Sequence, residues 1–239
     1  MSLSKNHIKL ITSLSQKKYR QKHKLFVVEG VKVVQEFLNS SYELEIVFST
    51  DTDFSSTNKF IEVTDQELKK ISSLKNPNKV LAIFKIPNQI NPITGGLILA
   101  LDSINDPGNL GTIIRLCDWF GIEQLVCSNE TVDCFNSKVV QASMGSLTRV
   151  AVSYLDLKKY LQNALVPIFV ADMDGLNVYK TKLPDSAVLV LGNEANGISD
   201  EIKQLVTTKI TIPRYGAFQQ TESLNVATAS AILLSEFRR

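Results

Sequence analysis

Apolar residues recur along the second half of the chain in short runs that read as buried strands, with amphipathic helical stretches between them. Strands are expected at 97–101, 124–127, 148–152, 167–171, 187–191 and 209–212. Helices are expected near 110–120, 136–144, 155–163, 200–206 and 224–237. This alternation predicts an α/β fold with a mostly parallel sheet covered by helices on both faces.

The first half shows the same alternation on a smaller scale and predicts a small α/β unit. Strands are expected at 25–28, 44–49, 60–63 and 80–86, and helices at 7–15, 31–38 and 65–71. The last of these helices follows a capping-box pattern, Thr64-Asp65-Gln66-Glu67. Between the halves, residues 87–96 hold two prolines, two asparagines and a glycine pair, which is typical of a linker. We therefore expect domains at 1–92 and 93–239.

Composition indicates a globular protein with a hydrophobic core, since 44% of the residues are hydrophobic. No apolar run is long enough to span a bilayer, and the first residues lack a signal-peptide pattern, so a cytoplasmic protein without a membrane partner is expected. The three cysteines form no CxxC pair, which favours buried reduced thiols over a metal site.

Positive charge is concentrated at the start of the chain. Residues 1–28 hold seven basic residues and no acid, whereas the remaining residues hold 19 basic and 24 acidic ones. Such segregation favours a polyanionic partner such as RNA. The candidate RNA contacts in this segment are Lys17, Lys18, Arg20, Lys22 and Lys24. A solvated, lysine-rich helix face is the alternative interpretation.

Three corners rich in Gly, Asn and Pro follow predicted strands in the second half. They lie in LDSINDPGNLGTIIR (101–115), LGNEANGIS (191–199) and IPRYGAFQQTESLNVA (212–227). Ligands of α/β proteins bind at the carboxyl ends of strands, so the three corners predict one composite site. The chain contains neither GxxxxGK[ST] nor GxGxxG, which argues against a P-loop NTPase and a dinucleotide-binding domain.

In order and spacing, these three motifs resemble the SpoU (TrmH-type) branch of the SPOUT RNA ribose 2′-O-methyltransferases over residues 97–239. The VVEG at 27–30 resembles the small substrate-binding domain of that family, which is similar to RNA-binding ribosomal proteins. The resemblance implies a deep trefoil knot in the second domain and a homodimer without a metal. The implied cofactor is S-adenosylmethionine, with S-adenosylhomocysteine as product. The implied partner is RNA, ribosomal RNA before transfer RNA.

The resemblance also implies residue roles. The implied cofactor-binding residues are Leu191, Gly192, Asn193, Gly197, Ile212, Pro213, Ser223, Leu224 and Asn225. The implied catalytic residues are Arg115, Asn109, Glu194 and Asn225. Because a guanidinium stays protonated, we expect Arg115 to act as an electrostatic clamp on the forming alkoxide or an adjacent phosphate rather than as a base. Arg149 matches a family segment near the active site and is a candidate phosphate contact.

Several alternatives stay open at this point. Arg115 would otherwise form a surface ion pair, Asn109 would cap its helix, and Glu194 would orient Arg115 or relay a proton. The apolar last helix fits packing within one subunit as well as packing between two. The segment 214–222 is longer than the common family motif, with Arg214 where methionine is common, and the roles of its residues are undefined. A non-catalytic RNA-binding protein and an unrelated nucleotide-binding enzyme are the competing functions.

Overall fold

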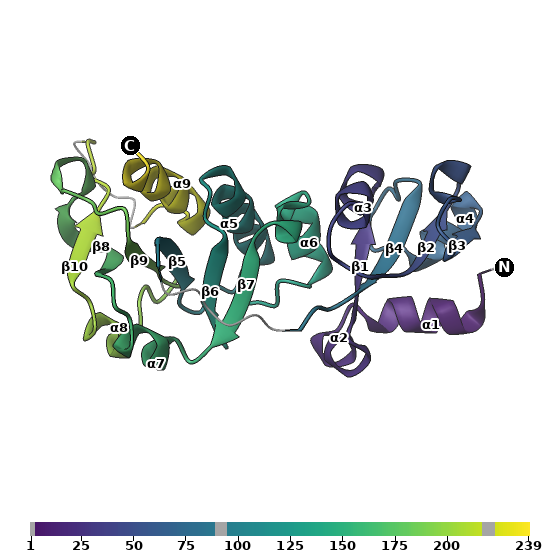
Figure 1. Cartoon of the computed structure of the whole chain (residues 1–239), viewed down its shortest axis with the longest axis horizontal. Coiled ribbons are helices and arrows are strands. Elements are labelled where there is room, and N and C mark those ends of the chain that lie inside the picture. The colour runs from purple at the N-terminus through teal and green to yellow at the C-terminus, as the bar shows by residue number, and fades with distance from the viewer. Residues whose placement is uncertain (1–2, 89–94, 217–222) are drawn as a thin grey trace. The chain divides into compact units, whose positions relative to one another are not determined.

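The structure is a computed structural model, which describes residues 3–88, 95–216 and 223–239. The chain forms two compact units (Figure 1). The first contains residues 1–88 and 133–148, and the second contains residues 89–132 and 149–239. The predicted division into domains 1–92 and 93–239 stays a prediction, and the structure adds that the segment 133–148 packs within the first unit.

The first unit is built on a four-stranded sheet in the order β1-β4-β2-β3. Its strands are β1 (Leu25–Glu29), β2 (Leu44–Ser49), β3 (Phe60–Glu62) and β4 (Val80–Lys85). Its helices are α1 (Lys5–Ser13), α2 (Lys17–His23), α3 (Val31–Leu38), α4 (Asp65–Ile71) and α6 (Ser137–Ser143), with short 3₁₀ turns at Thr52–Phe54 and Ser146–Thr148. The small α/β unit predicted for the first half is therefore present.

Alternation along β4 explains how this sheet is covered on both faces. Leu81 and Ile83 point into a core shared with Ile11 of α1 and Leu68 of α4. Phe84 points the other way, into an aromatic cluster. That cluster contains Phe26, Phe37, Tyr42, Phe84 and Phe135. Phe135 comes from the segment 133–148, so this segment completes the core of the first unit.

The second unit is a six-stranded parallel sheet in the order β10-β8-β9-β5-β6-β7. Its strands are β5 (Leu97–Leu101), β6 (Gln124–Ser128), β7 (Ala151–Leu155), β8 (Ile168–Asn177), β9 (Ala187–Leu191) and β10 (Thr208–Thr211). Its helices are α5 (Pro107–Trp119), α7 (Leu157–Gln162), α8 (Asp200–Lys203) and α9 (Val226–Phe237), with a 3₁₀ turn at Val178–Lys180. Helices α5 and α9 lie on one face and α7 and α8 on the other (Figure 1). The predicted parallel sheet with two covered faces is confirmed. The trefoil knot stays a prediction.

The central strands are fully buried, as expected for a parallel sheet covered on both sides. The residues of β5 and β9 pair from Leu97 with Ala187 to Leu101 with Leu191, so the two strands end side by side. Of the described residues, none belongs to a helix long and apolar enough to cross a bilayer.

Among the expected ranges that differ from the structure, three have an identifiable reason. The strand expected at 148–152 begins at Ala151, because Thr148 lies in a 3₁₀ turn and its hydroxyl donates to the carbonyl of Gly145. The strand expected at 167–171 continues to Asn177, pairing with β10 across a register shift. The first helix begins at Lys5, because Ser4 and His7 form a reciprocal capping box.

Candidate active site

Polar side chains from all three sequence motifs meet beyond the ends of β5 and β9. The Asn109 Nδ2 donates to Glu194 Oε1 at 2.7 Å. The Asn225 Nδ2 donates to Asn109 Oδ1 at 2.9 Å. Asn109 therefore joins a residue of the second motif to one of the third, over separations of 85 and 116 residues. The composite site expected from the sequence has this physical link at its centre.

Helix capping orients two members of this chain of hydrogen bonds. Asn225 is the N-cap of α9, and its Oδ1 accepts from the backbone N–H groups of Ala227 and Thr228. With the oxygen used in this way, its Nδ2 faces Asn109. The suggestion that Asn109 caps α5 is wrong, because Asp106 is the N-cap and its Oδ1 accepts from the backbone N–H of Asn109 at 2.8 Å. The amide group of Asn109 is thus available for the site.

The second motif forms a compact loop around Asn193. The backbones of Asn193 and Gly197 pair in both directions, at 2.9 and 2.8 Å. The Asn193 Oδ1 accepts from the N–H groups of Ala195 and Asn196, and its Nδ2 donates to the carbonyl of Ser103 at 2.7 Å. Asn193 therefore shapes its own loop and ties that loop to the end of β5.

Gly192 is required by close backbone packing. A Cβ added at Gly192 would lie 2.4 Å from the Gly197 carbonyl carbon and 2.5 Å from the Ile198 nitrogen. Gly197 has φ of +67°, a left-handed conformation that disfavours other side chains. The two glycines therefore differ: Gly192 is required by lack of space, whereas Gly197, where a Cβ would meet nothing within 4 Å in the described part of the chain, is favoured by its backbone conformation.

Asp102 and Ser103 belong to the same region and were not singled out in the sequence. Asp102 is buried, and its Oδ2 accepts from the backbone N–H of Ser199 at 2.8 Å, at the start of α8. Ser103 donates its hydroxyl to Asp102 Oδ1 and has φ of +60°. The signal that points to them is an acidic residue and a serine directly after a buried strand, the position where ligand sites form in α/β sheets.

Arg115 lies on the exposed side of α5, six residues beyond Asn109. Within the described residues it forms no hydrogen bond or ion pair, so the interpretation as a surface ion pair finds no support there. One alternative was that Glu194 orients Arg115; within the described residues the two side chains form no contact, and Glu194 Oε1 accepts from Asn109. Among the described residues, the guanidinium of Arg115 therefore has no hydrogen-bond or ion-pair partner.

The remaining candidate cofactor contacts are mostly apolar residues, and they differ in how far their side chains are exposed to solvent. Leu191 is buried, Ile212 and Pro213 are half-buried, and Leu224 is 49% exposed. Ser223 is exposed and lies two residues before the N-cap of α9. Apolar side chains beside close-packed backbone and a few fixed polar groups suit an adenine ring with its polar edge. These residues fit S-adenosylmethionine. At Gly192, the close contact with the backbone of Gly197 leaves no room for a side chain.

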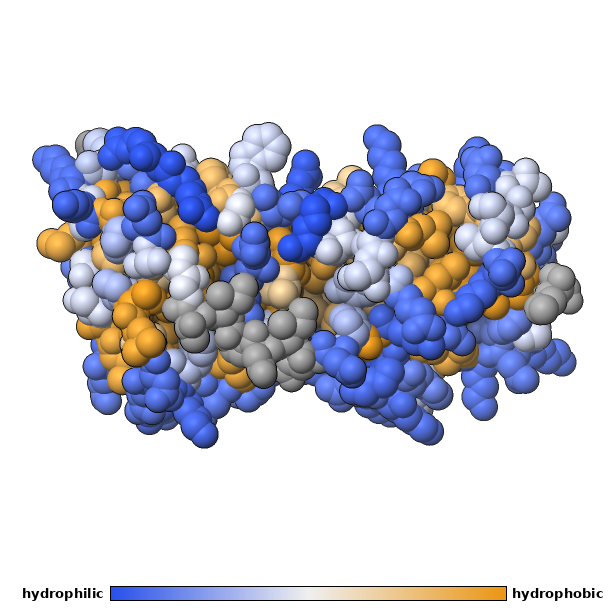
Figure 2. Space-filling view, in the orientation of Figure 1, coloured by the Kyte–Doolittle hydropathy of each residue, from blue (hydrophilic) through white to orange (hydrophobic). Residues whose placement is uncertain are grey.

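The candidate RNA contacts of the first unit separate into two groups. Lys17, Lys18, Lys22 and Lys24 are exposed on or just after α2. Figure 2 shows a hydrophilic surface over the position of α2 in Figure 1. Arg20, in contrast, is only 2% exposed. The sequence did not distinguish it from its lysine neighbours.

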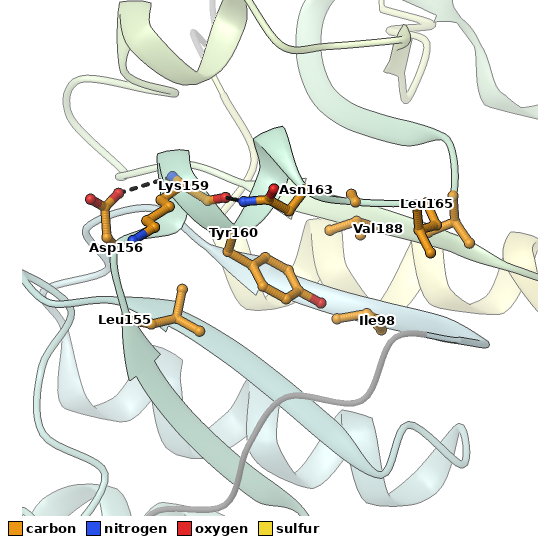
Figure 3. A pocket seen from close by; sticks show the side chains of 10 residues that line it. Ile98, Leu155, Asp156, Lys159, Tyr160, Asn163, Leu165 and Val188 are labelled. Atoms are coloured by element: carbon orange, nitrogen blue, oxygen red, sulfur yellow. Dashed lines mark hydrogen bonds between the residues drawn. The ribbon is translucent and has the colours of Figure 1, made fainter.

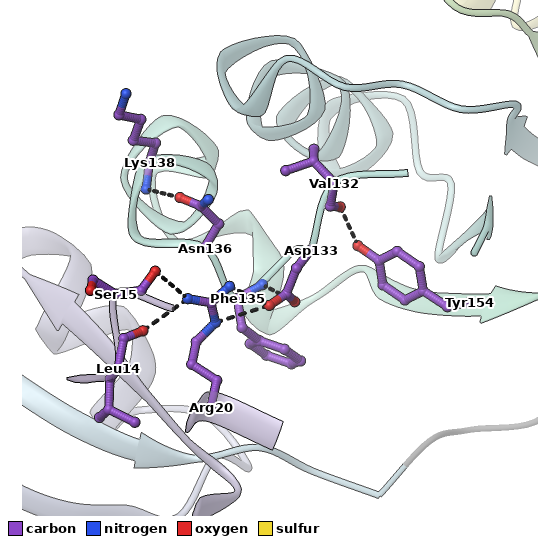
Figure 4. Close-up of polar contacts among 9 residues, drawn as sticks. All are labelled: Leu14, Ser15, Arg20, Val132, Asp133, Phe135, Asn136, Lys138 and Tyr154. Carbon is purple, nitrogen blue, oxygen red and sulfur yellow. Dashed lines mark hydrogen bonds and ion pairs between the residues drawn. The ribbon is translucent and has the colours of Figure 1, made fainter. Parts of the chain in front are cut away.

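Arg20 is held by two other segments of the first unit, residues 14–15 and residue 133 (Figure 4). Its Nε and Nη2 donate to Asp133 Oδ2 at 2.9 and 2.6 Å. Its Nη1 donates to the carbonyls of Leu14 and Ser15. With its guanidinium used inside the unit, Arg20 does not present a charge to an RNA phosphate in this structure. Its role in the structure is to fasten α2 and residue 133 together.

Arg149 is exposed and lies in the second unit. Its Nε and Nη2 contact both carboxylate oxygens of Asp118 at 2.9 to 3.1 Å. This pairing places Arg149 beside the last turn of α5. Its contact with phosphate stays a prediction.

An apolar cavity of about 370 Å³ lies elsewhere in the second unit, beside α7 (Figure 3). Its lining includes Ile98 and Val188, near the amino ends of β5 and β9. It is therefore at the opposite end of the strands from the candidate site. The described ranges contain no group of three or more His, Cys, Asp or Glu side chains that could hold a metal ion.

The second unit has a parallel sheet with a polar site at its strand ends, and the first unit has a basic segment at its start, features that fit an enzyme acting on a nucleic acid. Comparison with known proteins identifies the family. Residues 96–235 match the SpoU rRNA Methylase family, and residues 5–82 match the MRM3-like substrate binding domain. The chain belongs to the SpoU rRNA methylase family.

Proteins that are similar over nearly the whole length of this chain support the same assignment. The 23S rRNA (guanosine(2553)-2′-O)-methyltransferase RlmP of Bacillus subtilis (strain 168) is 29% identical, covering 94% of this chain and 93% of its own. A putative RNA methyltransferase of the TrmH family from Porphyromonas gingivalis has a TM-score of 0.90 at 39% identity, covering 100% of this chain and 99% of its own. An AdoMet-bound rRNA methyltransferase from Sinorhizobium meliloti has a TM-score of 0.88 at 28% identity, covering 100% and 96%. The protein is an RNA 2′-O-methyltransferase, and its cofactor is S-adenosylmethionine.

Proposed function

We propose that this enzyme methylates a ribose 2′-hydroxyl of large-subunit ribosomal RNA, and that the site is the cluster around Asn109, Glu194 and Asn225. The observation that carries the proposal is the hydrogen-bonded chain joining these three residues, one from each motif. The substrate class is supported by the 23S rRNA relative, whose similarity extends through both units. Transfer RNA is the second candidate.

The bound cofactor supplies a methyl group on a sulfonium, which makes the methyl carbon electrophilic without a metal. The protein has to hold the ribose and accommodate negative charge at the 2′-oxygen as its proton leaves. Arg115 is our candidate for the second task, because it is a cation on the exposed side of α5, six residues beyond Asn109. A cation close to the 2′-oxygen stabilises the negative charge that develops there.

The chain of amides has a positioning role in this proposal. Glu194 accepts from Asn109, and Asn109 accepts from Asn225, so each amide has a defined orientation. Glu194 is also the carboxylate available to receive a proton, directly or through water. Leu191, Ile212, Pro213 and Leu224 would enclose the cofactor, while Gly192, Asn193, Gly197 and Ser223 would offer backbone or polar groups to it.

We further propose a cytoplasmic homodimer. The outer side of α9 retains half-buried apolar residues, Ala229, Ala231 and Ile232, next to its buried inner side. A second copy covering this side would remove apolar area from water. Sedimentation analysis at several concentrations tests the dimer, and a monomer throughout would reject it.

The substrate is tested with RNA from cells that lack the gene. Purified enzyme and labelled S-adenosylmethionine are offered 23S rRNA, 16S rRNA and transfer RNA separately. We expect label only in 23S rRNA, at one nucleotide. Label in transfer RNA alone would reject the ribosomal substrate while leaving the chemistry intact.

A further inference from the structure

Among the described residues of the second unit, Trp119 is one of two aromatic residues that are 83% exposed, the other being Tyr215. Trp119 is the last residue of α5. A large aromatic ring left in water is unfavourable unless a partner covers it. It is also the single tryptophan of the chain.

The position of Trp119 relates it to the active site. The residues Gly108, Thr112, Arg115 and Trp119 are all exposed and succeed one another at intervals of four, three and four. Such spacing places them on one side of α5. This exposed stripe begins beside Asn109, in the hydrogen-bonded chain of the site, and ends at Trp119. Arg115 and Trp119 are therefore neighbours, one helical turn apart.

The surroundings of Trp119 are rich in arginine. Arg238 donates from Nε to the carbonyl of Phe120 and from Nη2 to the carbonyl of Gly121, both at 2.9 Å, at the end of α5. Arg149 lies against Asp118, the residue before Trp119. Within the described part of the chain, neither Arg115 nor Arg238 has a carboxylate partner, so their charges are not compensated locally.

We infer that Trp119 is a stacking platform for an unpaired base of the RNA substrate, close in sequence to the nucleotide whose ribose enters the site. This inference rests on the proposed function. An exposed aromatic ring among cations matches the two surfaces of an RNA strand, its bases and its phosphates. A ribose in a folded RNA is reached most easily when its nucleotide is unstacked, and a platform beside Arg115 holds the displaced neighbour.

The chain offers a direct optical test, because all tryptophan fluorescence comes from Trp119. Titration of the full-length protein with poly(A) should quench the emission, since stacked bases quench indole. Heparin, a polyanion without bases, should bind without comparable quenching. Equal quenching by heparin, or unchanged emission when filter binding shows saturation with poly(A), would overturn the inference.

Substitution of Trp119 provides a second test of the inference. Trp119→Ala should weaken poly(A) binding about five- to one-hundred-fold, the range expected for one base–aromatic stack. Trp119→Phe should retain most of the affinity. Leu165→Ala removes a similarly exposed side chain close to α7, and it should leave the affinity for poly(A) unchanged. Wild-type RNA affinity in Trp119→Ala would overturn the inference.

A second copy of the chain is the competing occupant. If it covered Trp119, the emission would shift to shorter wavelength as protein concentration rises, and Trp119→Ala would dissociate the dimer. Either result overturns the stacking role. Calorimetric titration of the same preparation with S-adenosylhomocysteine keeps the two proposals apart, because a lack of cofactor binding counts against the proposed function alone.

Discussion

At the scale of single residues, the proposed site depends on a few residues whose contacts restrict what could replace them. Asn109 donates through Nδ2 to Glu194 and accepts through Oδ1 from Asn225, so both ends of its amide are used. An aspartate there would lose the donor and face the carboxylate of Glu194. Gly192 is fixed by a different cause, the lack of space for any Cβ.

Gly192→Ala should weaken binding of S-adenosylhomocysteine. Its Cβ would meet the backbone of Gly197 at 2.4 Å, so the loop of the second motif has to move. Overpacking of this kind costs about 1–3 kcal/mol, or roughly five- to one-hundred-fold in affinity if the strain appears in the loop. Calorimetry measures the affinity for S-adenosylhomocysteine. The matched control is Gly216→Ala, because a Cβ added at Gly216 would meet nothing within 4 Å among the described residues. Equal affinities for the two variants would contradict this account of the loop.

Arg115→Ala should lower the rate of methyl transfer about 100- to 1,000-fold, the usual loss on removing one group that stabilises a developing oxyanion. The affinity for S-adenosylhomocysteine should stay within about a few-fold, because the expected role is in the transfer step. Single-turnover kinetics with saturating RNA measure the rate, and Lys182→Ala, at another exposed position of the second unit, is the control. A substantially active Arg115→Ala enzyme would remove Arg115 from the chemistry.

At the scale of elements, α2 carries both buried and exposed basic residues on one short helix. Its lysines face the solvent, while Arg20 faces inward and binds Asp133. The basic run therefore contains a structural residue among candidate RNA contacts. A helix whose charges are uniform in sequence is divided by its 3.6-residue period into an inner and an outer side.

Replacing Lys17, Lys18, Lys22 and Lys24 with Gln should weaken RNA binding at low salt and flatten its dependence on salt. If each lysine neutralises one phosphate, the slope of log K against log salt should fall by roughly three. Filter binding between low and moderate salt measures the slope. Gln at Lys69 and Lys70, exposed on α4 of the same unit, is the control, and an equal effect there would make α2 an ordinary solvated helix.

The elements that were predicted best are those set by local patterns. Strands β5 and β9 match the expected ranges of 97–101 and 187–191, because buried runs bounded by turn residues are a local signal. The capping box before α4 is confirmed. The burial of Arg20 was not predictable, since its partner Asp133 is 113 residues away. The hydrogen bonds of Asn109 span 85 and 116 residues, so the corners were identified but their contacts were not.

At the scale of the whole molecule, the first unit is made of two stretches of chain, residues 1–88 and 133–148. Residues 133–148 leave the second unit between β6 and β7 and pack within the first. They contribute Asp133 to Arg20, Phe135 to the ring of Phe26 at 4.7 Å, and the carbonyl of Leu147 to the hydroxyl of Tyr42. The amino-acid composition of residues 87–96 suggests a linker. It gives no sign that residues 133–148 pack within the first unit.

A fragment ending at residue 92 should therefore be much less stable than the same unit in the full chain. Removing the partner of a buried charge costs about 3–5 kcal/mol, which approaches the total stability of a small domain. Thermal unfolding measures it, with the fragment compared to one that carries residues 133–148 on a flexible linker. Arg20→Met in the short fragment should recover part of the loss, and a short fragment as stable as the longer one would contradict the role of this segment.

The central claim is that the three motifs form one site for methyl transfer to a ribose 2′-oxygen. The most direct measurement is transfer of labelled methyl from S-adenosylmethionine to unmodified 23S rRNA, followed by complete alkaline hydrolysis. A 2′-O-methyl group prevents cleavage at its own nucleotide, so the account predicts label in alkali-stable dinucleotides, and its loss in Arg115→Ala. Label in mononucleotides would place the methyl group on a base and contradict the account.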